Sequence, residues 1–454
     1  MLFLFEIHIC IFASRTFQRG KKENKNMTAH IVPLVSESLV GLQTWVRQQE
    51  HGLAAGTLSR QQSSIPGPSQ QLPGSIGGPL NWSRLDSVDK KVKRLELTAS
   101  DISEIDRALE AFNGLELDGD EVTRERFPLP NLESQLEQCA LEVHRGIGLC
   151  IIRGLKPERY SVEDNIVLFL GLSSFIGDQR GLQNSKGDML SHVTESKSWT
   201  APKEKRHGIH TNDSLPFHND MGCEVLAIQV RDRAEAGGHT CVASMTAIYN
   251  ALMQSNPWVL HTLARHDWPI QTSRRAASFV LSPLLEYYAD NLLISMDPAR
   301  IGPHPLARNG SVPQLTAEQR EALAVLQDVA RKNQLRLETQ PGDIIFLNNL
   351  GLLHARESYQ DSASSSRHLV RLWLRNKRLG WAIPPSMRMP WEASFGDGAA
   401  RVVNRYYPIM PMPEYMECKY SNGTAAFVAD DDEGDEVIPK TIEDGTSLER
   451  RGDT

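Results

Sequence analysis

The chain has 454 residues, of which 40% are hydrophobic, enough for one large catalytic domain or two ordinary ones. Its formal net charge of −7 is mild and spread out, so it gives no reason to expect nucleic-acid binding. The six cysteines are scattered without a C-x-x-C pair, which argues against a zinc knuckle and a disulfide framework. We therefore expect a cytoplasmic protein whose cysteines are mostly small buried hydrophobes.

The N-terminus is apolar over residues 1–14 and becomes basic only afterwards, at Arg15 and residues 20–25. A signal peptide has its positive charge before the apolar core, and this stretch is too short to span a bilayer. We expect a dispensable leader, or translation upstream of a start at Met27, with a signal anchor as the minority alternative. Residues 63–80 are rich in Ser, Pro, Gly and Gln, as in linkers. Residues 1–80 are therefore predicted to be largely disordered.

The folded domain is predicted over residues 81–410, and its first part reads as helices around one strand. Apolar spacing and capping residues predict helices at 98–112, 131–144 and 161–177, and a strand at 148–155. Residues 181–216 are polar with weak periodicity. Because a long irregular segment before a metal motif is more often functional than disordered, we predict a loop or lid there.

Beyond residue 217 the pattern changes to short strands separated by polar turns. Predicted strands lie at 224–232, 236–244, 291–297, 334–340, 343–349, 351–358 and 368–376, and predicted helices at 245–254 and 316–332. This pattern favours an antiparallel barrel or jelly roll that carries additional helices. Residues 411–454 contain the acidic run 430–436 and are predicted to form a disordered tail.

Three residues form a candidate metal site within this pattern. His218 and Asp220 are separated by one residue, so in an extended segment both side chains point to the same face. His354 ends an apolar run far downstream, where a jelly roll can bring it alongside. Two imidazoles and one carboxylate suit Fe(II) and leave coordination positions open. Each element alone is weak, since a lone H-x-D or a strand-end histidine is usually structural.

The ordered set of motifs makes the case specific. LPFHND (215–220), GGHT (237–240), PGD (341–343), LHAR (353–356) and RHLVRLWLRN (367–376) follow one another in this order. The set resembles the TauD/TfdA-like (taurine dioxygenase) family of Fe(II)/2-oxoglutarate-dependent oxygenases, and its uncharacterised fungal branch in particular. The resemblance implies a double-stranded β-helix, the clavaminate-synthase-like jelly roll, with flanking helices.

Carried over by position, the resemblance makes His218, Asp220 and His354 the iron ligands and the catalytic residues. It makes Arg367 the partner of the distal carboxylate of 2-oxoglutarate, a group that suits a guanidinium fork. Thr240 matches a threonine that helps hold 2-oxoglutarate. Arg371 lies on the same strand face as Arg367 and matches an arginine that contacts an anionic substrate in some members.

The expected activity is hydroxylation of an unactivated C–H bond in a small organic substrate. Fe(II), 2-oxoglutarate and dioxygen would take part, with succinate and carbon dioxide as co-products. We expect no nucleic-acid or membrane partner, and a homo-oligomer is left open. A non-catalytic jelly-roll binding protein is the alternative from another class, and a zinc hydrolase is a second one. His192, Asn212 and Arg356 are weaker candidates, each of which reads more simply as a structural residue.

Overall fold

The computed structural model describes residues 72–83, 88–184, 187–200, 202–203, 206–271, 279–303 and 312–411. All of them belong to one compact unit, Glu37–Thr454. The predicted leader, the first half of the predicted linker and the acidic tail lie outside the described residues. None of the described helices is both long enough and apolar enough to cross a membrane.

The helices occur mostly where the sequence predicts them. They are α2 (Ala99–Asn113), α3 (Glu133–Arg145), α4 (Val162–Ser174), α5 (Met245–Ser255), α6 (Pro257–Leu263), α7 (Ala317–Asn333), α8 (Arg388–Phe395) and α9 (Asp397–Ala400). The cap residues explain several of these boundaries. Thr98 and Asp101 form a reciprocal capping box at the start of α2, and the Ser161 side chain accepts from the backbone of Asp164 at the start of α4.

Most strands belong to two sheets. The major sheet has the order β1 (Lys93–Glu96), β2 (Leu149–Arg153), β14 (Ile344–Asn348), β6 (Val225–Asp232), β17 (His368–Arg375) and β3 (Gln179–Arg180), with β4 (Leu190–Thr194) also paired to β17. The minor sheet has the order β13 (Leu335–Arg336), β8 (Thr240–Ser244), β15 (Leu352–Arg356) and β5 (Leu215–His218). Three further pairs join β9 (Trp268–Gln271) to β10 (Phe279–Ser282), β11 (Leu285–Tyr288) to β12 (Asn291–Ile294), and β7 (Ala236–Gly237) to β16 (Tyr359–Gln360).

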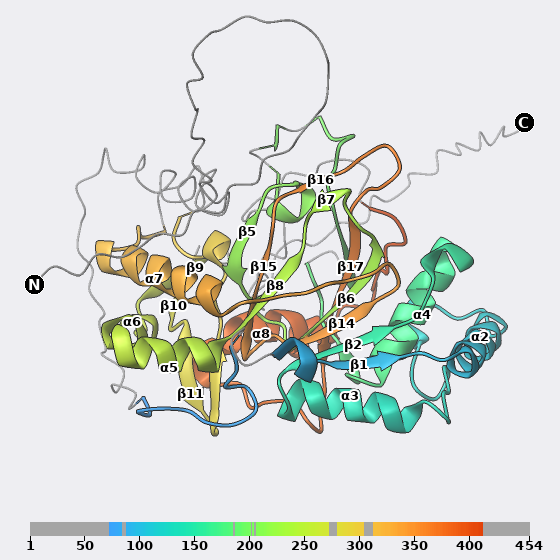
Figure 1. Cartoon of the computed structure of the whole chain (residues 1–454), viewed down its shortest axis with the longest axis horizontal. Coiled ribbons are helices and arrows are strands. Elements are labelled where there is room, and N and C mark those ends of the chain that lie inside the picture. The colour runs from blue at the N-terminus through green and yellow to red at the C-terminus, as the bar shows by residue number, and fades with distance from the viewer. Residues whose placement is uncertain are drawn as a thin grey trace, which may run out of the picture. The chain divides into compact units, whose positions relative to one another are not determined.

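Successive side chains along each strand point to opposite faces of its sheet. One apolar core therefore lies between the two sheets, and a further core lies on each outer face. Leu226 and Ile228 of β6 share the inner core with Val242 of β8 and Leu352 of β15. The outer face of the major sheet packs with α2, α3 and α4, and that of the minor sheet with α5, α6 and α7. Figure 1 shows these two groups of helices on opposite sides of the strands. The predicted double-stranded β-helix with flanking helices is confirmed.

Two boundaries differ from the predictions. The last part of the predicted linker packs on the domain, since Leu72 and Ile76 contact the core under α5 and the Ile76 backbone bonds to Asn250. The predicted boundary at residue 80 is therefore too late, because a few apolar side chains suffice to hold a Pro/Gly-rich segment. The predicted loop 181–216 also contains a strand, β4, which pairs with β17. It was not predicted because some of the side chains on its buried face are polar.

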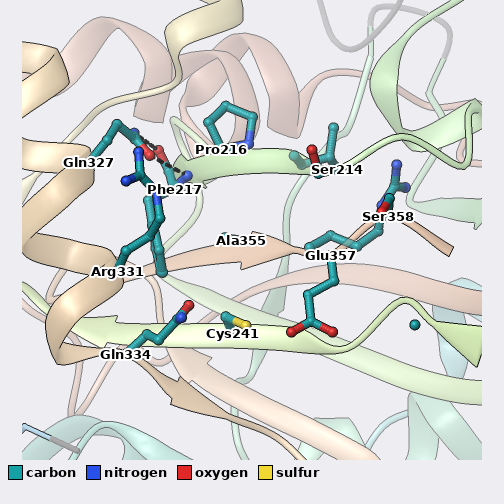
Figure 2. A pocket seen from close by; sticks show the side chains of 13 residues that line it. Ser214, Pro216, Phe217, Cys241, Gln327, Arg331, Gln334, Ala355, Glu357 and Ser358 are labelled. Atoms are coloured by element: carbon teal, nitrogen blue, oxygen red, sulfur yellow. Dashed lines mark hydrogen bonds between the residues drawn. The ribbon is translucent and has the colours of Figure 1, made fainter. Parts of the chain in front are cut away.

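A cavity of about 330 Å³ lies on the outer face of the minor sheet, between that sheet and α7. Figure 2 shows Arg331 of α7 and Gln334, which follows that helix, facing Phe217, Cys241 and Ala355 across the cavity. These three strand residues alternate with those that point between the sheets. The cavity therefore lies on the opposite side of the minor sheet from the inner core.

Candidate metal and co-substrate site

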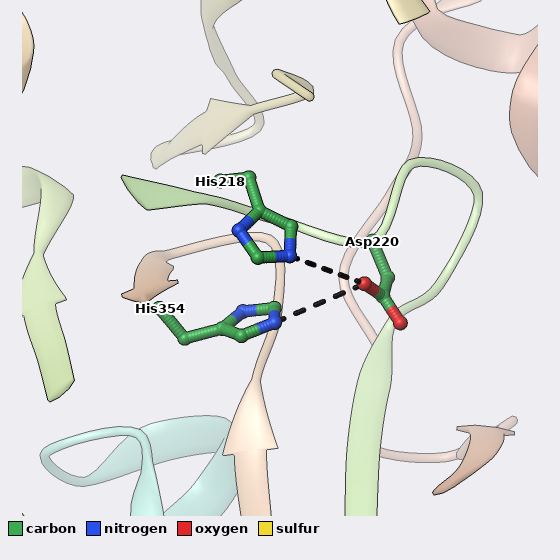
Figure 3. A group of neighbouring side chains, drawn as sticks. All are labelled: His218, Asp220 and His354. Carbon is green, nitrogen blue, oxygen red and sulfur yellow. Dashed lines mark ion pairs between the residues drawn. The ribbon is translucent and has the colours of Figure 1, made fainter. Parts of the chain in front are cut away.

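The three predicted metal ligands converge at one end of the space between the sheets. The histidine Nε2 atoms lie 4.0 Å (His218) and 3.8 Å (His354) from Oδ1 of Asp220. One ligand atom from each residue lies within 4.8 Å of the other two, and no other group of three such side chains occurs among the described residues. Figure 3 shows His218 at the end of β5, Asp220 in the following turn, and His354 on β15 beside them.

Hydrogen bonds set the chemical state of each ligand. Nδ1 of His218 lies 2.8 Å from the carbonyl oxygen of Pro216, which can only accept, so Nδ1 carries the proton and the Nε2 lone pair faces Asp220. Burial, with the neighbouring His218, lowers the pKa of His354 to about 3. Burial therefore favours the neutral, cation-binding form of His354, and the hydrogen bond of His218 turns its Nε2 towards Asp220.

Asp220 is held as an anion by residues of the major sheet. Its burial opposes ionisation, but Arg371, the two histidines and Trp373 together keep its pKa well below the ordinary value. Trp373 Nε1 donates to Oδ2 at 2.7 Å, and Arg371 Nη1 lies 3.0 Å from the same oxygen. This arrangement occupies Oδ2 and leaves Oδ1 facing the imidazoles.

Asn219, which lies between the candidate ligands His218 and Asp220, stabilises the turn through its side-chain hydrogen bonds. Asn219 is buried and points away from the imidazoles, as the sequence predicts. Its amide donates to the carbonyl oxygens of Ile294 and Asn349 and accepts from the Met296 backbone. The Asn349 side chain in turn bonds to the backbone N–H and C=O of Asp220. The carboxylate is thus positioned by its backbone as well as by its own hydrogen bonds.

Arg367 and Thr240, the two predicted 2-oxoglutarate contacts, line one cavity of about 70 Å³. Arg367 is buried; its Nε donates to Gly238 O at 2.9 Å, while its Nη1 has no hydrogen-bond partner. Gly238 has φ +72°, and a Cβ there would lie 2.8 Å from Cδ of Arg367. The GG pair of the GGHT motif therefore gives the guanidinium its place. The side chain of His239 is bonded to Glu357 and Arg336 and not to Arg367.

Arg371 is already engaged in the structure. Besides Asp220, its guanidinium contacts Gln183 Oε1 at 3.0 Å and Ser191 Oγ at 3.5 Å. Its side chain therefore holds Asp220, and the predicted contact with co-substrate or substrate stays a prediction.

Of the weaker candidates, His192 and Arg356 have structural partners, whereas Asn212 bonds to Tyr359 through its backbone carbonyl and its Oδ1 is buried without a partner. His192 lies in a chain of hydrogen bonds with His368 and the Pro408 carbonyl, on the helix-covered side of the major sheet. Arg356 donates to the carbonyl oxygens of Gly208 and Asp213, within the predicted lid. Sequence reasoning missed Trp373 and Asn349. The first could have been found, because it lies two residues after Arg371 and so faces the same side of β17.

Comparison with known proteins agrees with this geometry. The family model for "Taurine catabolism dioxygenase TauD, TfdA family" matches residues 113–373. A "Taurine hydroxylase-like protein SAT17" from Stachybotrys chartarum is 32% identical over 335 residues, covering 72% of this chain and 86% of that protein. An "FR-33289 synthase" from Streptomyces rubellomurinus is 26% identical over 319 residues, covering 67% and 91% of the two chains.

Similar solved structures include an asparagine oxygenase in complex with Fe(II), hydroxyasparagine and succinate, with 14% identity, a TM-score of 0.49 and coverage of 62% and 93% of the two chains. Another is the non-heme iron oxygenase OrfP with Fe and alpha-ketoglutaric acid, with 17% identity, a TM-score of 0.45 and coverage of 63% and 94%. The family match and the relative that is 32% identical decide the assignment, and the Stachybotrys relative fits the predicted fungal branch. The chain belongs to the TauD/TfdA family, and it is an Fe(II)- and 2-oxoglutarate-dependent dioxygenase with a jelly-roll core.

Proposed function

We propose that His218, Asp220 and His354 hold Fe(II) in this enzyme. The observation that carries the proposal is the convergence of the three donors within 4.8 Å, with Oδ1 of Asp220 facing both imidazoles. Two imidazoles and one carboxylate match the facial set used by non-heme iron oxygenases. With 2-oxoglutarate and dioxygen, the iron supplies hydroxylation of an unactivated C–H bond in a small organic substrate, with succinate and carbon dioxide as co-products.

Arg367 and Thr240 are proposed to bind the distal carboxylate of 2-oxoglutarate. The unpartnered Nη1 of Arg367 supports this role, because a buried guanidinium without an anion is unfavourable and a carboxylate would satisfy it. The proximity of Thr240 in the same cavity supplies a hydroxyl for the same group.

The remaining residues around the site orient the ligands and exclude water. Trp373 and Arg371 fix the carboxylate orientation and keep it ionised without competing for Oδ1. Buried Trp199, Ile209 and His210 give the preceding loop its own small core, which supports the proposal that residues 181–216 cover the site.

Substrate choice is proposed to reside in that loop. The names of the relatives justify a screen that begins with sulfonates and extends to amino acids, betaines and intermediates of secondary metabolism, scored by succinate release. We further propose a cytoplasmic enzyme without nucleic-acid or membrane partners, which the scattered cysteines support: the four in the described residues are buried and free. A homo-oligomer is compatible with this proposal.

The experiment that tests the metal and co-substrate roles is anaerobic addition of Fe(II) and 2-oxoglutarate to the purified protein. The weak visible charge-transfer band of the chelate should appear, and His354→Ala should abolish it. A non-catalytic jelly-roll protein, the alternative function, would retain no iron and show no band. Absence of the band in the wild type would therefore reject the proposal.

A further inference from the structure

Arg356 connects the metal-ligand strand with the loop that precedes the site. It lies two residues after His354 and is only 6% exposed. Its Nε donates to the Asp213 carbonyl at 3.1 Å, and its Nη2 donates to the Gly208 carbonyl at 3.1 Å. The third nitrogen, Nη1, is buried and has no partner. Two of the three guanidinium nitrogens therefore bind carbonyls of the loop, and Nη1 has no structural role of this kind.

The ring of Tyr359 joins Arg356 to Arg367. The guanidinium carbons of the two arginines lie 5.2 and 5.4 Å from the ring centroid. Nη1 of each arginine and the hydroxyl of Tyr359 are all buried without a hydrogen-bond partner. Since buried polar atoms are nearly always satisfied, three unpartnered donors on side chains that meet at one ring point to a missing acceptor.

The charges point to an anion. Within the described part of the chain neither guanidinium forms an ion pair, although Arg356 is only 6% and Arg367 only 4% exposed. The carboxylates nearest in sequence are engaged elsewhere. Glu357 pairs with other basic side chains, and Asp361 binds Lys197 with one oxygen and the Arg367 backbone N–H with the other. Two buried cations therefore share one aromatic ring with no negative charge assigned to them.

We propose that Arg356 and Tyr359 join Arg367 in binding the distal carboxylate of 2-oxoglutarate, so that the co-substrate site contains two guanidiniums and one phenol. The inference rests on the proposed function. A carboxylate offers about four lone-pair positions, which can accept from both Nη1 atoms, the phenol and Thr240. Because Arg356 also holds Gly208 and Asp213, an occupied site would be tied directly to the loop over the iron.

The test compares two ligands that differ only at this end, namely 2-oxoglutarate and 2-oxovalerate, which lacks the distal carboxylate. Dissociation constants are measured by calorimetry and by the charge-transfer band, on Fe(II)-loaded protein without dioxygen. Arg356→Gln should weaken 2-oxoglutarate about ten- to a hundredfold, and Tyr359→Phe roughly three- to tenfold. Neither should change the affinity for 2-oxovalerate. Arg331→Gln, which removes the other guanidinium of the outer cavity that Arg356 also lines, should change neither ligand.

The outcomes separate this inference from the function on which it rests. Equal weakening of both ligands by Arg356→Gln would show that Arg356 only supports the loop. Unchanged affinity in both variants, with 2-oxoglutarate lost in Arg367→Gln, would reject the two-arginine site and keep the proposed function. A wild type that binds no 2-oxoglutarate would reject both. If Arg356→Gln does not fold, Arg356→Lys and Tyr359→Phe decide, since the phenol has no hydrogen bond to lose in the free protein.

Discussion

Gly238→Ala is the substitution that most directly tests how the backbone positions the co-substrate arginine. The residue has φ +72°, and an added Cβ would lie 2.8 Å from Cδ and 3.0 Å from Nε of Arg367, and 3.0 Å from Cβ of Tyr359. Contacts this short require a neighbour to move. The Tyr359 Cβ is close to its backbone, so the arginine side chain must yield, and its hydrogen bond to Gly238 O is lost.

Two energy terms follow from this geometry. A non-glycine residue in the left-handed region costs about 1–2 kcal/mol of folding free energy. Displacing Arg367 removes a hydrogen bond between charged groups, worth about 1.5–3 kcal/mol, when 2-oxoglutarate binds. The second term corresponds to roughly a ten- to hundredfold rise in the dissociation constant for 2-oxoglutarate. The affinity for iron should not change, because none of the three metal ligands contacts Gly238.

Gly78→Ala supplies a matched control. Gly78 has φ +96°, and no atom lies within 4 Å of the place that a Cβ would take, so the variant has the backbone strain without the crowding. Urea denaturation should show a similar loss of stability in both variants. Calorimetry with 2-oxoglutarate on the iron-loaded proteins should show weakened binding in Gly238→Ala alone. Equal binding by the two variants would refute the claim that this glycine makes room for Arg367.

Three further predictions concern the support of the site and the outer face of the sheet. Trp373→Phe removes the hydrogen bond to Asp220 and should weaken iron binding about tenfold, measured by competition with a chelator; unchanged affinity would contradict the role of the indole. Asn219→Ala leaves two carbonyls and one N–H without partners and should cost about 2–4 kcal/mol in chemical denaturation, whereas a loss below about 1 kcal/mol would contradict the bracing role. Burial lowers the pKa of His192 to about 4 and of His368 to about 3, so the unfolded chain binds more protons below the ordinary value of about 6.5. Stability should therefore fall with pH from about 6.5 to 4, by about 1 kcal/mol per histidine at pH 5.5, and His368→Gln should reduce that slope; an equal slope would contradict it.

The convergence of the three candidate metal ligands could be predicted from the sequence, because the spacing of His218 and Asp220 indicates their local geometry. His218 and Asp220 obey the two-residue period although only the first belongs to β5, since Asn219 continues the extended path with its side chain buried on the other side. His354 follows from the apolar run before it. Its distance from the other two in the chain could be bridged only by the jelly-roll topology, which the motif order indicated.

The supporting residues were harder to predict because their roles depend on which strands become neighbours. Trp373 lies on β17 in the major sheet, while the imidazoles stand on the minor sheet. Its position two residues after Arg371 indicates which face of β17 it lies on, but not that its partner is a carboxylate 153 residues away. Strand β4 was missed for a related reason. Its buried face includes His192 and Thr194, which the hydrophobic pattern does not count as buried.

The two sheets contribute different parts of the candidate metal site, so only the folded barrel brings the three side chains together. The minor sheet carries both imidazoles, and the major sheet holds the carboxylate through Trp373 and Arg371. A cation bound by all three would therefore link the two sheets at the end where Arg356 and Arg367 also converge on Tyr359. Iron and co-substrate would thus stabilise the same end of the barrel, and each should order it for the other. The H-x-D motif predicts which metal binds. The end of the barrel where Arg356 and Arg367 meet Tyr359 would couple the binding of that metal to the binding of 2-oxoglutarate.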